Sequence, residues 1–268
     1  MNDILIRLIS AFIPTKKRRD SFRKKWGYRQ GKLHLLYSKQ IITKLSIMKD
    51  NLWRINNCVF YVPNYPLDSI QSAIVDTNNF YDIDTLQKLD EYIPDNAVLC
   101  DIGSNIGNHT LYWALKRNAR FIYAFEPIPS TYEILEKNIQ LNYLQNVVTS
   151  YNFGLSNKEI NASITLYNGS NIGATFIHQA SDGHLKLKTL DSLSLDKKID
   201  LLKIDVEGHE IEALQGSIET IKLYKPSIFV ESFGENIEKI KQILLPLEYK
   251  LVKEFTGENY LFINQNKM

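Results

Sequence analysis

Two glycines and four polar side chains occur within one short segment, Asp101-Ile-Gly-Ser-Asn-Ile-Gly-Asn108, directly after an apolar run. Gly103 and Gly107 allow a ligand to approach the backbone closely, because neither carries a side chain. The segment departs from the dinucleotide pattern G-x-G-x-x-G and lacks the Gly-Lys-Ser/Thr of a phosphate loop. It is typical of a loop that binds a nucleoside-like ligand with an amino-acid tail, whose ammonium group Asp101 or Asn105 would bind. In the alternative interpretation, these two residues hold the loop in shape.

Glu126 ends the next apolar run, 25 residues after Asp101, and Pro127 follows it. A carboxylate at the end of such a strand accepts hydrogen bonds from both hydroxyls of a ribose. The order of strand, glycine segment, helix, strand and Glu-Pro is more specific than any of its parts. It predicts that Glu126 binds the ribose of the same ligand. A tight structural turn with a surface glutamate is the alternative.

A third polar group lies in Lys203-Ile-Asp-Val-Glu-Gly-His-Glu210, at the end of another apolar run. Lys203 and Asp205 share one face of the expected strand, since side chains alternate along a strand. A lysine inside a central parallel strand is unfavourable unless it is paired. We therefore predict that Lys203 forms an ion pair with Asp205, Asp101 or Glu231, each at or near a strand end.

Strands and helices that alternate along the chain must position these residues. Strands with helical crossovers are expected at residues 97–101, 120–126, 146–151, 199–205 and 227–231. The last two strands, 249–255 and 259–264, are too close together for a crossover and must pair antiparallel. The alternating segments 160–167 and 184–190 predict an inserted antiparallel hairpin, and one helical stripe runs from Ile211 to Ile221. The pattern predicts a doubly wound α/β sheet, whose ligands bind at the carboxyl ends of the strands.

We expect three regions: a basic arm at 1–50, an N-terminal cap or substrate region at 51–95, and the main domain at 96–268. The cap region is expected to begin with two short strands around Asn56-Asn57. Its aromatic stretch, residues 59–81, would wall the acceptor pocket or pack into the core.

The basic arm differs in charge from the rest of the chain. Residues 1–49 contain thirteen Lys and Arg against two Asp, whereas the remainder has 19 Lys and Arg against 28 Asp and Glu. Apolar residues of 3–12 fall on one helical face, before a polybasic stretch. This predicts peripheral contact of residues 1–25 with an anionic inner membrane. In one alternative the helix packs on the protein's own domain, and in the other the arm binds single-stranded nucleic acid.

The chain resembles the FkbM family in five blocks that occur in family order: VLCDIGSNIGNHT, AFEPIPSTYEIL, NFGLSN, LKTLDSL and DLLKIDVEGHEIEALQG. The resemblance covers about residues 52–265. It implies an S-adenosylmethionine-dependent methyltransferase with the seven-strand Rossmann-like fold. It also implies O-methylation of a hydroxyl on a sugar or secondary metabolite, in bacteria commonly for surface polysaccharide. Asp101, Gly103, Asn105, Gly107, Glu126 and Asn152 of these blocks are the expected cofactor-binding residues.

Methyl transfer to a sugar hydroxyl requires removal of the hydroxyl proton, and a positioned base assists this step. His209 and Asp205 are the first candidates and Glu207 the second; with Lys203 they form the expected catalytic group. In the alternative interpretation, His209 caps the following helix or faces solvent. Asp205, Glu207, His209 and Glu231 could instead hold Mg²⁺, but carboxylate clusters often serve ion pairs and caps, so we expect no metal.

The sequence favours an O-methyltransferase that acts on a glycan or a glycolipid-linked sugar in surface polysaccharide or glycolipid biosynthesis. A nucleic-acid methyltransferase is the first alternative, but no Asn-Pro-Pro motif follows the strand that ends near Asp205, and the acidic body would repel phosphates. A non-catalytic membrane scaffold and a nicotinamide oxidoreductase are the others. Only two cysteines occur, and no run of 18 apolar residues, so a cytoplasmic location is expected, peripheral on the inner membrane face. Exposed sheet edges could pair two copies in a homodimer.

Overall fold

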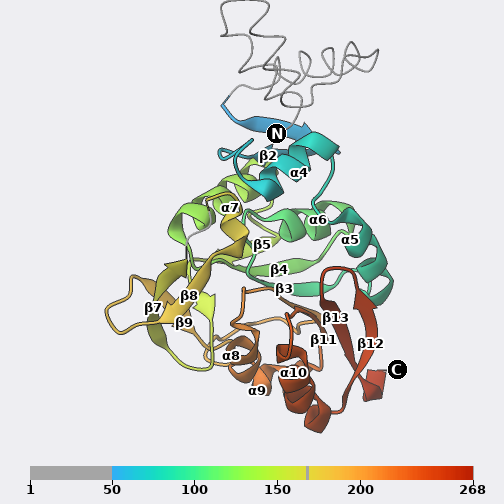
Figure 1. The fold of residues 1–268 in the computed structure, drawn as a ribbon. Helices are drawn as coiled ribbons and strands as arrows, with labels where there is room; N and C mark the ends of the chain where they lie inside the picture. Colours follow the sequence, from blue (N-terminus) through green and yellow to red (C-terminus); the bar gives the residue numbers. More distant parts are fainter. Residues whose placement is uncertain (1–49, 167–168, 268) are drawn as a thin grey trace, which may run out of the picture. The chain divides into compact units, whose positions relative to one another are not determined.

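The computed structural model describes residues 50–166 and 169–267 (Figure 1). The predicted basic arm therefore lies, except for residue 50, outside the described residues, and so does its proposed membrane contact through residues 1–25. In the described ranges, no helix combines the length and the apolar character that a membrane span requires.

Seven strands form the central sheet in the order β12-β13-β11-β10-β3-β4-β5. Their bounds are Val98–Ile102 (β3), Phe121–Phe125 (β4), Val148–Tyr151 (β5), Leu201–Ile204 (β10), Ser227–Glu231 (β11), Tyr249–Phe255 (β12) and Asn259–Asn264 (β13). Strands β5, β4, β3, β10 and β11 are parallel, whereas β13 pairs antiparallel with β11 and β12. This confirms the predicted α/β class with its antiparallel closing pair. After β3 the chain adds β4 and β5 on one side of the sheet, and after β10 it adds β11 on the other side. The point at which the strand order reverses therefore lies between β3 and β10.

Helices cover both faces of this sheet (Figure 1). One face carries α4 (Ser69–Thr77), α5 (Ile83–Leu89), α6 (Asn108–Lys116) and α7 (Pro129–Leu141), and the other carries α8 (Glu210–Gln215), α9 (Ile218–Tyr224) and α10 (Asn236–Leu244). Each face has its own buried apolar cluster, the first around Trp113 and Leu135 and the second around Leu214 and Ile240. The shorter 3-10 helices are η1 (Asp90–Tyr92), η2 (Ile172–Ala174), η3 (Leu245–Leu247) and η4 (Gln265–Lys267).

The single helical stripe expected from Ile211 to Ile221 is divided between α8 and α9. The first helix ends where Gly216 passes very close to the segment after β5. A Cβ atom on Gly216 would lie 1.9 Å from the carbonyl oxygen of Ser156. The close approach of these two backbones therefore interrupts a helix that its apolar spacing alone would continue.

A hairpin of β1 (Leu52–Ile55) and β2 (Cys58–Tyr61) opens the described part of the chain, as predicted. Asn56 and Asn57 take the left-handed φ values of 48° and 67° that a two-residue hairpin turn of this kind requires. Asn138 of α7 and Asn142, which caps the C-terminus of that helix, bind the backbone of β2. Each side-chain oxygen accepts from a strand N–H, and each side-chain amide donates to a strand carbonyl. The division between regions 51–95 and 96–268 stays a prediction.

The inserted pair is part of a larger sheet in the order β6-β9-β7-β8 (Figure 1). Its strands are Gly154–Leu155 (β6), Ile160–Leu166 (β7), Phe176–Gln179 (β8) and Leu185–Lys188 (β9). The predicted antiparallel pairing of β7 with β9 is confirmed. The sequence does not reveal β8, because its four residues alternate between exposed and half-buried positions and bury no apolar face.

Candidate active site

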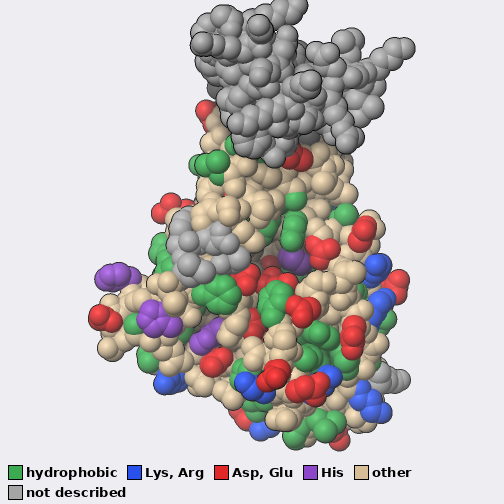
Figure 2. Space-filling view, viewed as in Figure 1, with side chains coloured by type: hydrophobic (Ala, Val, Ile, Leu, Met, Phe, Trp, Pro, Cys, Tyr) green, Lys and Arg blue, Asp and Glu red, His purple; other side chains and the backbone are tan. Residues whose placement is uncertain are grey.

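A cavity of about 310 Å³ lies at the carboxyl ends of β3, β4, β10 and β11. Its floor consists of the residues that follow these strands. Its outer walls come from the N-terminal region, through Ile70 and Tyr81, and from residues 171–177 of the insert. Figure 2 shows acidic side chains gathered at the centre of the visible face, beside histidine and hydrophobic side chains.

Asp68 joins the two outer walls of the cavity. It is fully buried and caps the N-terminus of α4, where Oδ1 accepts a hydrogen bond from the N–H of Gln71 at 2.8 Å. Its second oxygen, Oδ2, accepts from the N–H of Ile172 in the insert, also at 2.8 Å. Beside it, the N–H of Ser69 donates to the carbonyl of Ser170. The insert is therefore fixed to the N-terminal region by a charged group shielded from water.

Lys203 forms the predicted ion pair, with two of its three expected partners. Its Nζ atom lies 3.2 Å from Oδ1 of Asp101 and 3.3 Å from Oδ2 of Asp205, and it donates to the carbonyl of Gly103 at 2.8 Å. Burial opposes the charge of the lysine, but the two carboxylates outweigh it and raise the pKa of Lys203. The other oxygen of Asp101 accepts from the hydroxyl of Thr110 at 2.6 Å. Both oxygens of Asp101 thus have protein partners, as expected of a residue that holds the loop.

The glycine loop packs directly against Asp205, the residue that follows β10. Gly103 has a φ of 79°, and a Cβ atom there would lie 1.8 Å from the carbonyl oxygen of Asp205. Gly107 has a φ of 91° at the start of α6, and its Cβ would lie 2.8 Å from the side chain of Leu135. Two positions thus require glycine, because a side chain would be both strained and obstructed.

Glu126 shapes the opposite side of this loop. Its carboxylate accepts from the N–H of Asn105 at 3.0 Å and from the N–H of Ile128 at 2.9 Å. The side chain is only 5% exposed, and this burial raises the pKa of Glu126 to about 7, although the two backbone bonds work in the other direction. Asn152 donates to the carbonyls of Glu126 and Pro127, so it holds this turn from behind the cavity.

The polar atoms at this end of the cavity fit S-adenosylmethionine. Asn105 lines the cavity, and its Oδ1 atom is buried without a hydrogen-bond partner among the described residues. An ammonium group would supply the missing donor. Each Glu126 oxygen accepts a single backbone hydrogen bond and has further capacity for a ribose hydroxyl. Both residues therefore offer acceptors for groups that this cofactor donates.

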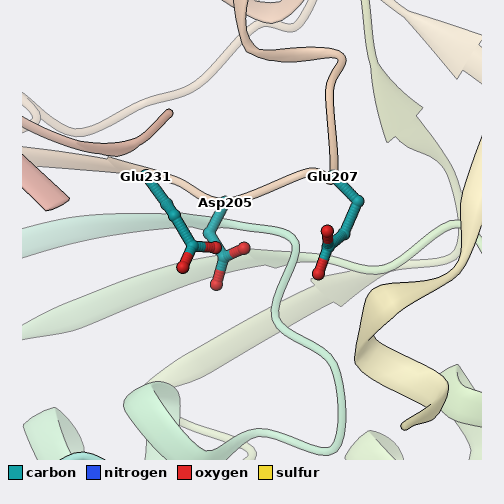
Figure 3. A group of neighbouring side chains, drawn as sticks. All are labelled: Asp205, Glu207 and Glu231. Carbon is teal, nitrogen blue, oxygen red and sulfur yellow. The ribbon is translucent and has the colours of Figure 1, made fainter. Parts of the chain in front are cut away.

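Three carboxyl groups, those of Asp205, Glu207 and Glu231, form an acidic cluster at the other end of the cavity (Figure 3). One oxygen of each lies within 4.8 Å of the others. Burial and the nearby Asp205 raise the pKa of Glu231 to about 9, and the same two causes raise that of Glu207 to about 7. Burial would also raise the pKa of Asp205, but Lys203 and a hydrogen bond from Glu231 keep it below its usual value. The cluster thus pairs an ionised Asp205 with a protonated Glu231.

The backbone around Glu207 is strained. Its φ is 51°, in a region that costs a residue with a side chain roughly 1–2 kcal/mol, and Gly208 follows with a φ of 90°. Glu210 supports this turn, since its carboxylate accepts from the N–H of Gly208 at 2.8 Å. The turn directs the Glu207 carboxyl toward Asp205 and Glu231 (Figure 3).

His209 lines the cavity, but its ring nitrogens contact residues outside the acidic cluster. Nε2 lies 3.0 Å from the hydroxyl of Ser156, and Nδ1 lies 3.7 Å from a carboxylate oxygen of Glu212. Burial lowers the pKa of His209, and Glu212 counteracts this only in part. Of the four residues considered for a divalent cation, Asp205, Glu207 and Glu231 lie together and His209 does not.

The structure divides the predicted site residues into two groups. Those that line the cavity are Gly103, Asn105, Glu126, Asp205, Glu207 and His209. Those that lie behind its wall and support it are Asp101, Gly107, Asn152 and Lys203. Sequence reasoning missed Asn108, whose side chain binds both backbone groups of Tyr81, and it missed the cavity-lining ring of Phe233. No sequence motif marks Asn108 or Phe233. For Asn108, its position at the end of the glycine segment could have indicated a role, whereas no comparable signal exists for Phe233.

A family model described as the methyltransferase FkbM domain matches residues 101–251, which include the glycine loop, Glu126 and the acidic cluster. The chain belongs to the FkbM methyltransferase family. It is thus a member of a family of S-adenosylmethionine-dependent methyltransferases, as its motifs predicted. The match begins at the buried Asp101, so the residues that build the cavity floor all lie within it.

Relatives of this FkbM methyltransferase include proteins from an archaeon and a fungus. The hexuronic acid methyltransferase AglP of Haloferax volcanii is 31% identical over 182 residues, which cover 66% of this chain and 72% of AglP. Methyltransferase 1 of Beauveria bassiana is 28% identical over 150 residues, covering 46% of this chain and 59% of that protein. A crystal structure of a methyltransferase FkbM from Methylobacillus flagellatus matches with a TM-score of 0.48 and 15% identity, over 72% of this chain and 60% of that one.

Proposed function

We propose that this FkbM methyltransferase transfers a methyl group to a hydroxyl of a sugar, in the biosynthesis of a surface polysaccharide or glycolipid. The observation that carries the proposal is the acidic cluster, which contains a carboxyl with a pKa raised to about 7 in the same cavity as Glu126 and Asn105. The relative named a hexuronic acid methyltransferase supports a sugar as the acceptor.

Glu126 and Asn105 are the residues proposed to hold the donor. Glu126 accepts from the ribose hydroxyls, Oδ1 of Asn105 accepts from the ammonium group, and Gly103 leaves room along the backbone. Bound S-adenosylmethionine supplies an electrophilic methyl group on a positively charged sulfur. Because Asp205 is an ionised carboxylate in the cavity wall, it also favours a cationic donor nearby.

Glu207 is the residue best placed to take the proton of the acceptor hydroxyl. A base is most effective when its pKa is close to the working pH, and Glu207 meets this condition. Asp205 is a weaker base because Lys203 stabilises its charge, and Glu231 already holds a proton. His209, the first candidate from the sequence, has both ring nitrogens near Ser156 and Glu212, so it becomes the alternative base.

The cavity argues against a nucleic-acid acceptor. Among the described residues that line it, none is a lysine or an arginine, whereas four are carboxylic acids. Phosphates bind where cations neutralise them, so this lining favours an acceptor without phosphate at the reacting position. We also propose that the enzyme works at the inner face of a membrane, where residues 1–25 would contact anionic lipid and bring it to a lipid-linked sugar.

Calorimetric titration of S-adenosylhomocysteine into the full-length protein tests the donor half of this proposal, with NADH as the matched control. We expect micromolar binding of S-adenosylhomocysteine and none of NADH. Labelled methyl transfer to a panel of glycosides then tests the acceptor half. Absence of S-adenosylhomocysteine binding would contradict the enzyme function and favour a scaffold, and methylation of RNA but of no glycoside would contradict the sugar acceptor.

A further inference from the structure

The cavity has two ends that differ in their lining. Glu126 follows β4 and Glu231 ends β11, and the sheet order β4-β3-β10-β11 separates these strands by three steps. Three inter-strand steps correspond to roughly 14 Å. If the donor occupies the end at Glu126, as the proposed function requires, the end at Glu231 is left for the acceptor.

Aromatic rings surround the acceptor end without being buried. Tyr81 and Phe233 both line the cavity, and they are 42% and 49% exposed. A third ring, that of Phe176 in β8, is 42% exposed. It lies beside the turn after Glu207, since a Cβ atom on Gly208 would be 3.6 Å from Phe176 Cε1. Three separate segments of the chain therefore bring half-exposed rings to the acidic cluster.

Tyr81 is held in place by the glycine segment. Its backbone N–H donates to Oδ1 of Asn108 at 2.9 Å, and its carbonyl accepts from Nδ2 of the same residue at 3.0 Å. Burial, followed by the charges of Asp82, Glu231, Asp205 and Glu207, raises the pKa of Tyr81, so its hydroxyl keeps its proton close to the acidic cluster. Its backbone is therefore fixed before any acceptor arrives.

The acidic cluster gives this end of the cavity negative charge, and the described lining residues offer no free cation. Among the described lining residues there is no lysine or arginine. The nearest ammonium, that of Lys203, already contacts Asp101, Asp205 and the carbonyl of Gly103. A sugar hydroxyl would donate to these carboxyl groups, whereas a sugar carboxylate would meet acceptors and like charge.

We propose that Tyr81, Phe176 and Phe233 form an acceptor subsite for an uncharged sugar ring, which stacks on these rings and presents one hydroxyl to the acidic cluster. The apolar C–H face of a sugar suits an aromatic ring, and half-exposed rings gain contact area when it binds. The subsite deepens the proposed function and rests on it, because it assumes the donor at the Glu126 end.

The test is saturation-transfer NMR on full-length protein loaded with S-adenosylhomocysteine. The probes are methyl glycosides of neutral hexoses and 6-deoxyhexoses, together with the matching methyl uronides. We expect saturation transfer from the protein to at least one neutral glycoside, and we expect the matching uronide to bind at least about tenfold more weakly. Phe233→Ala and Tyr81→Ala should each weaken the binding of the neutral glycoside about fivefold. Tyr143→Ala should not, because its ring is 88% exposed and does not line the cavity.

Three results would overturn the subsite: a uronide that binds as tightly as its neutral partner, aromatic variants that bind like the wild type, or no glycoside binding by protein that does bind S-adenosylhomocysteine. The last result would leave donor binding intact and therefore differs from failure of the proposed function. Failure of that function would appear first, as loss of S-adenosylhomocysteine binding in the loading step. Circular dichroism of each variant shows whether it is folded.

Discussion

Lys203 and Asp101 are register partners in neighbouring strands, and the ammonium of one lies 3.2 Å from the carboxylate of the other at the centre of the sheet. Both side chains are almost completely buried. The same ammonium binds Asp205 and the carbonyl of Gly103, so one cation connects the glycine loop with the acidic cluster. The two ends of the cavity, which we propose for the donor and the acceptor, therefore share one structural support.

Replacement of Lys203 should destabilise the whole domain. Lys203→Met leaves Asp101 buried without its counter-charge, which costs about 3–5 kcal/mol when one partner of a buried pair is removed. Lys222→Met removes an exposed pair with Glu219 and should change stability by less than about 1 kcal/mol. Urea unfolding measures both. Similar midpoints for the two variants would show that the buried pair contributes little.

Loss of the Glu126 carboxylate should weaken donor binding. Glu126→Ala removes the proposed acceptor for the ribose hydroxyls, and we expect S-adenosylhomocysteine to bind about 1–3 kcal/mol more weakly in calorimetry. Glu133→Ala, which truncates an exposed residue of α7, is the control. Unchanged affinity in the folded Glu126 variant would exclude Glu126 from the ribose site.

Glu207 and His209 can be distinguished by turnover. If Glu207 is the base, Glu207→Gln should lower kcat about 10²- to 10⁴-fold while donor affinity is kept. In the wild type, kcat should rise with pH and level off above the pKa of about 7, because the base must be deprotonated. A larger loss of kcat in His209→Ala than in Glu207→Gln would assign the role to His209.

Stability should fall as the pH rises from 7 to 8.5. The pKa of Glu231 is about 9 in the fold against 4.5 in an unperturbed chain, so in this range the folded state holds a proton that the unfolded state has released. The free energy of unfolding then decreases, by at most about 1.4 kcal/mol per pH unit, the slope for one whole proton. Urea midpoints should show this slope in the wild type and a flatter one in Glu231→Gln. A slope that is the same in both proteins would contradict a protonated Glu231, and Glu238→Gln serves as the exposed control.

Removal of residues 1–25 should release the protein from anionic vesicles and leave the fold unchanged. The arm, residues 1–49, has thirteen Lys and Arg against two Asp, whereas Asp and Glu outnumber Lys and Arg in the remainder. Binding through the arm should therefore weaken as salt screens its positive charge. Sedimentation with vesicles that contain phosphatidylserine, compared with neutral phosphatidylcholine vesicles, measures this. If the full-length protein sediments with neither kind of vesicle, the membrane proposal is wrong.

The sequence predicts the residues that lie at strand ends. Parallel strands bring their carboxyl ends to one edge of the sheet, so Asp101, Glu126, Asp205 and Glu231 had to lie along the same edge once their strands were recognised. The same reasoning paired Lys203, because a buried lysine requires a counter-charge. These predictions needed only strand order and the polarity of single residues.

The outer walls of the cavity could not be predicted in the same way. Tyr81 is placed by Asn108, 27 residues later, and Phe176 lies in a strand without a buried apolar face. No local pattern marks either ring, since its position depends on contacts between segments far apart in the chain. The division of α8 from α9 at Gly216 likewise results from a tertiary contact.

The buried Asp68 has a consequence for how acceptor preference is inherited and engineered. One wall of the cavity comes from the N-terminal region and the other from the insert, and the carboxylate of Asp68 binds the N–H of Ile172 across 104 positions of sequence. A chimera that exchanges only the insert would lose this fit and leave a buried charge without one of its donors. The two segments therefore form a single unit of recombination, and a change of acceptor by domain grafting requires both to be transferred together.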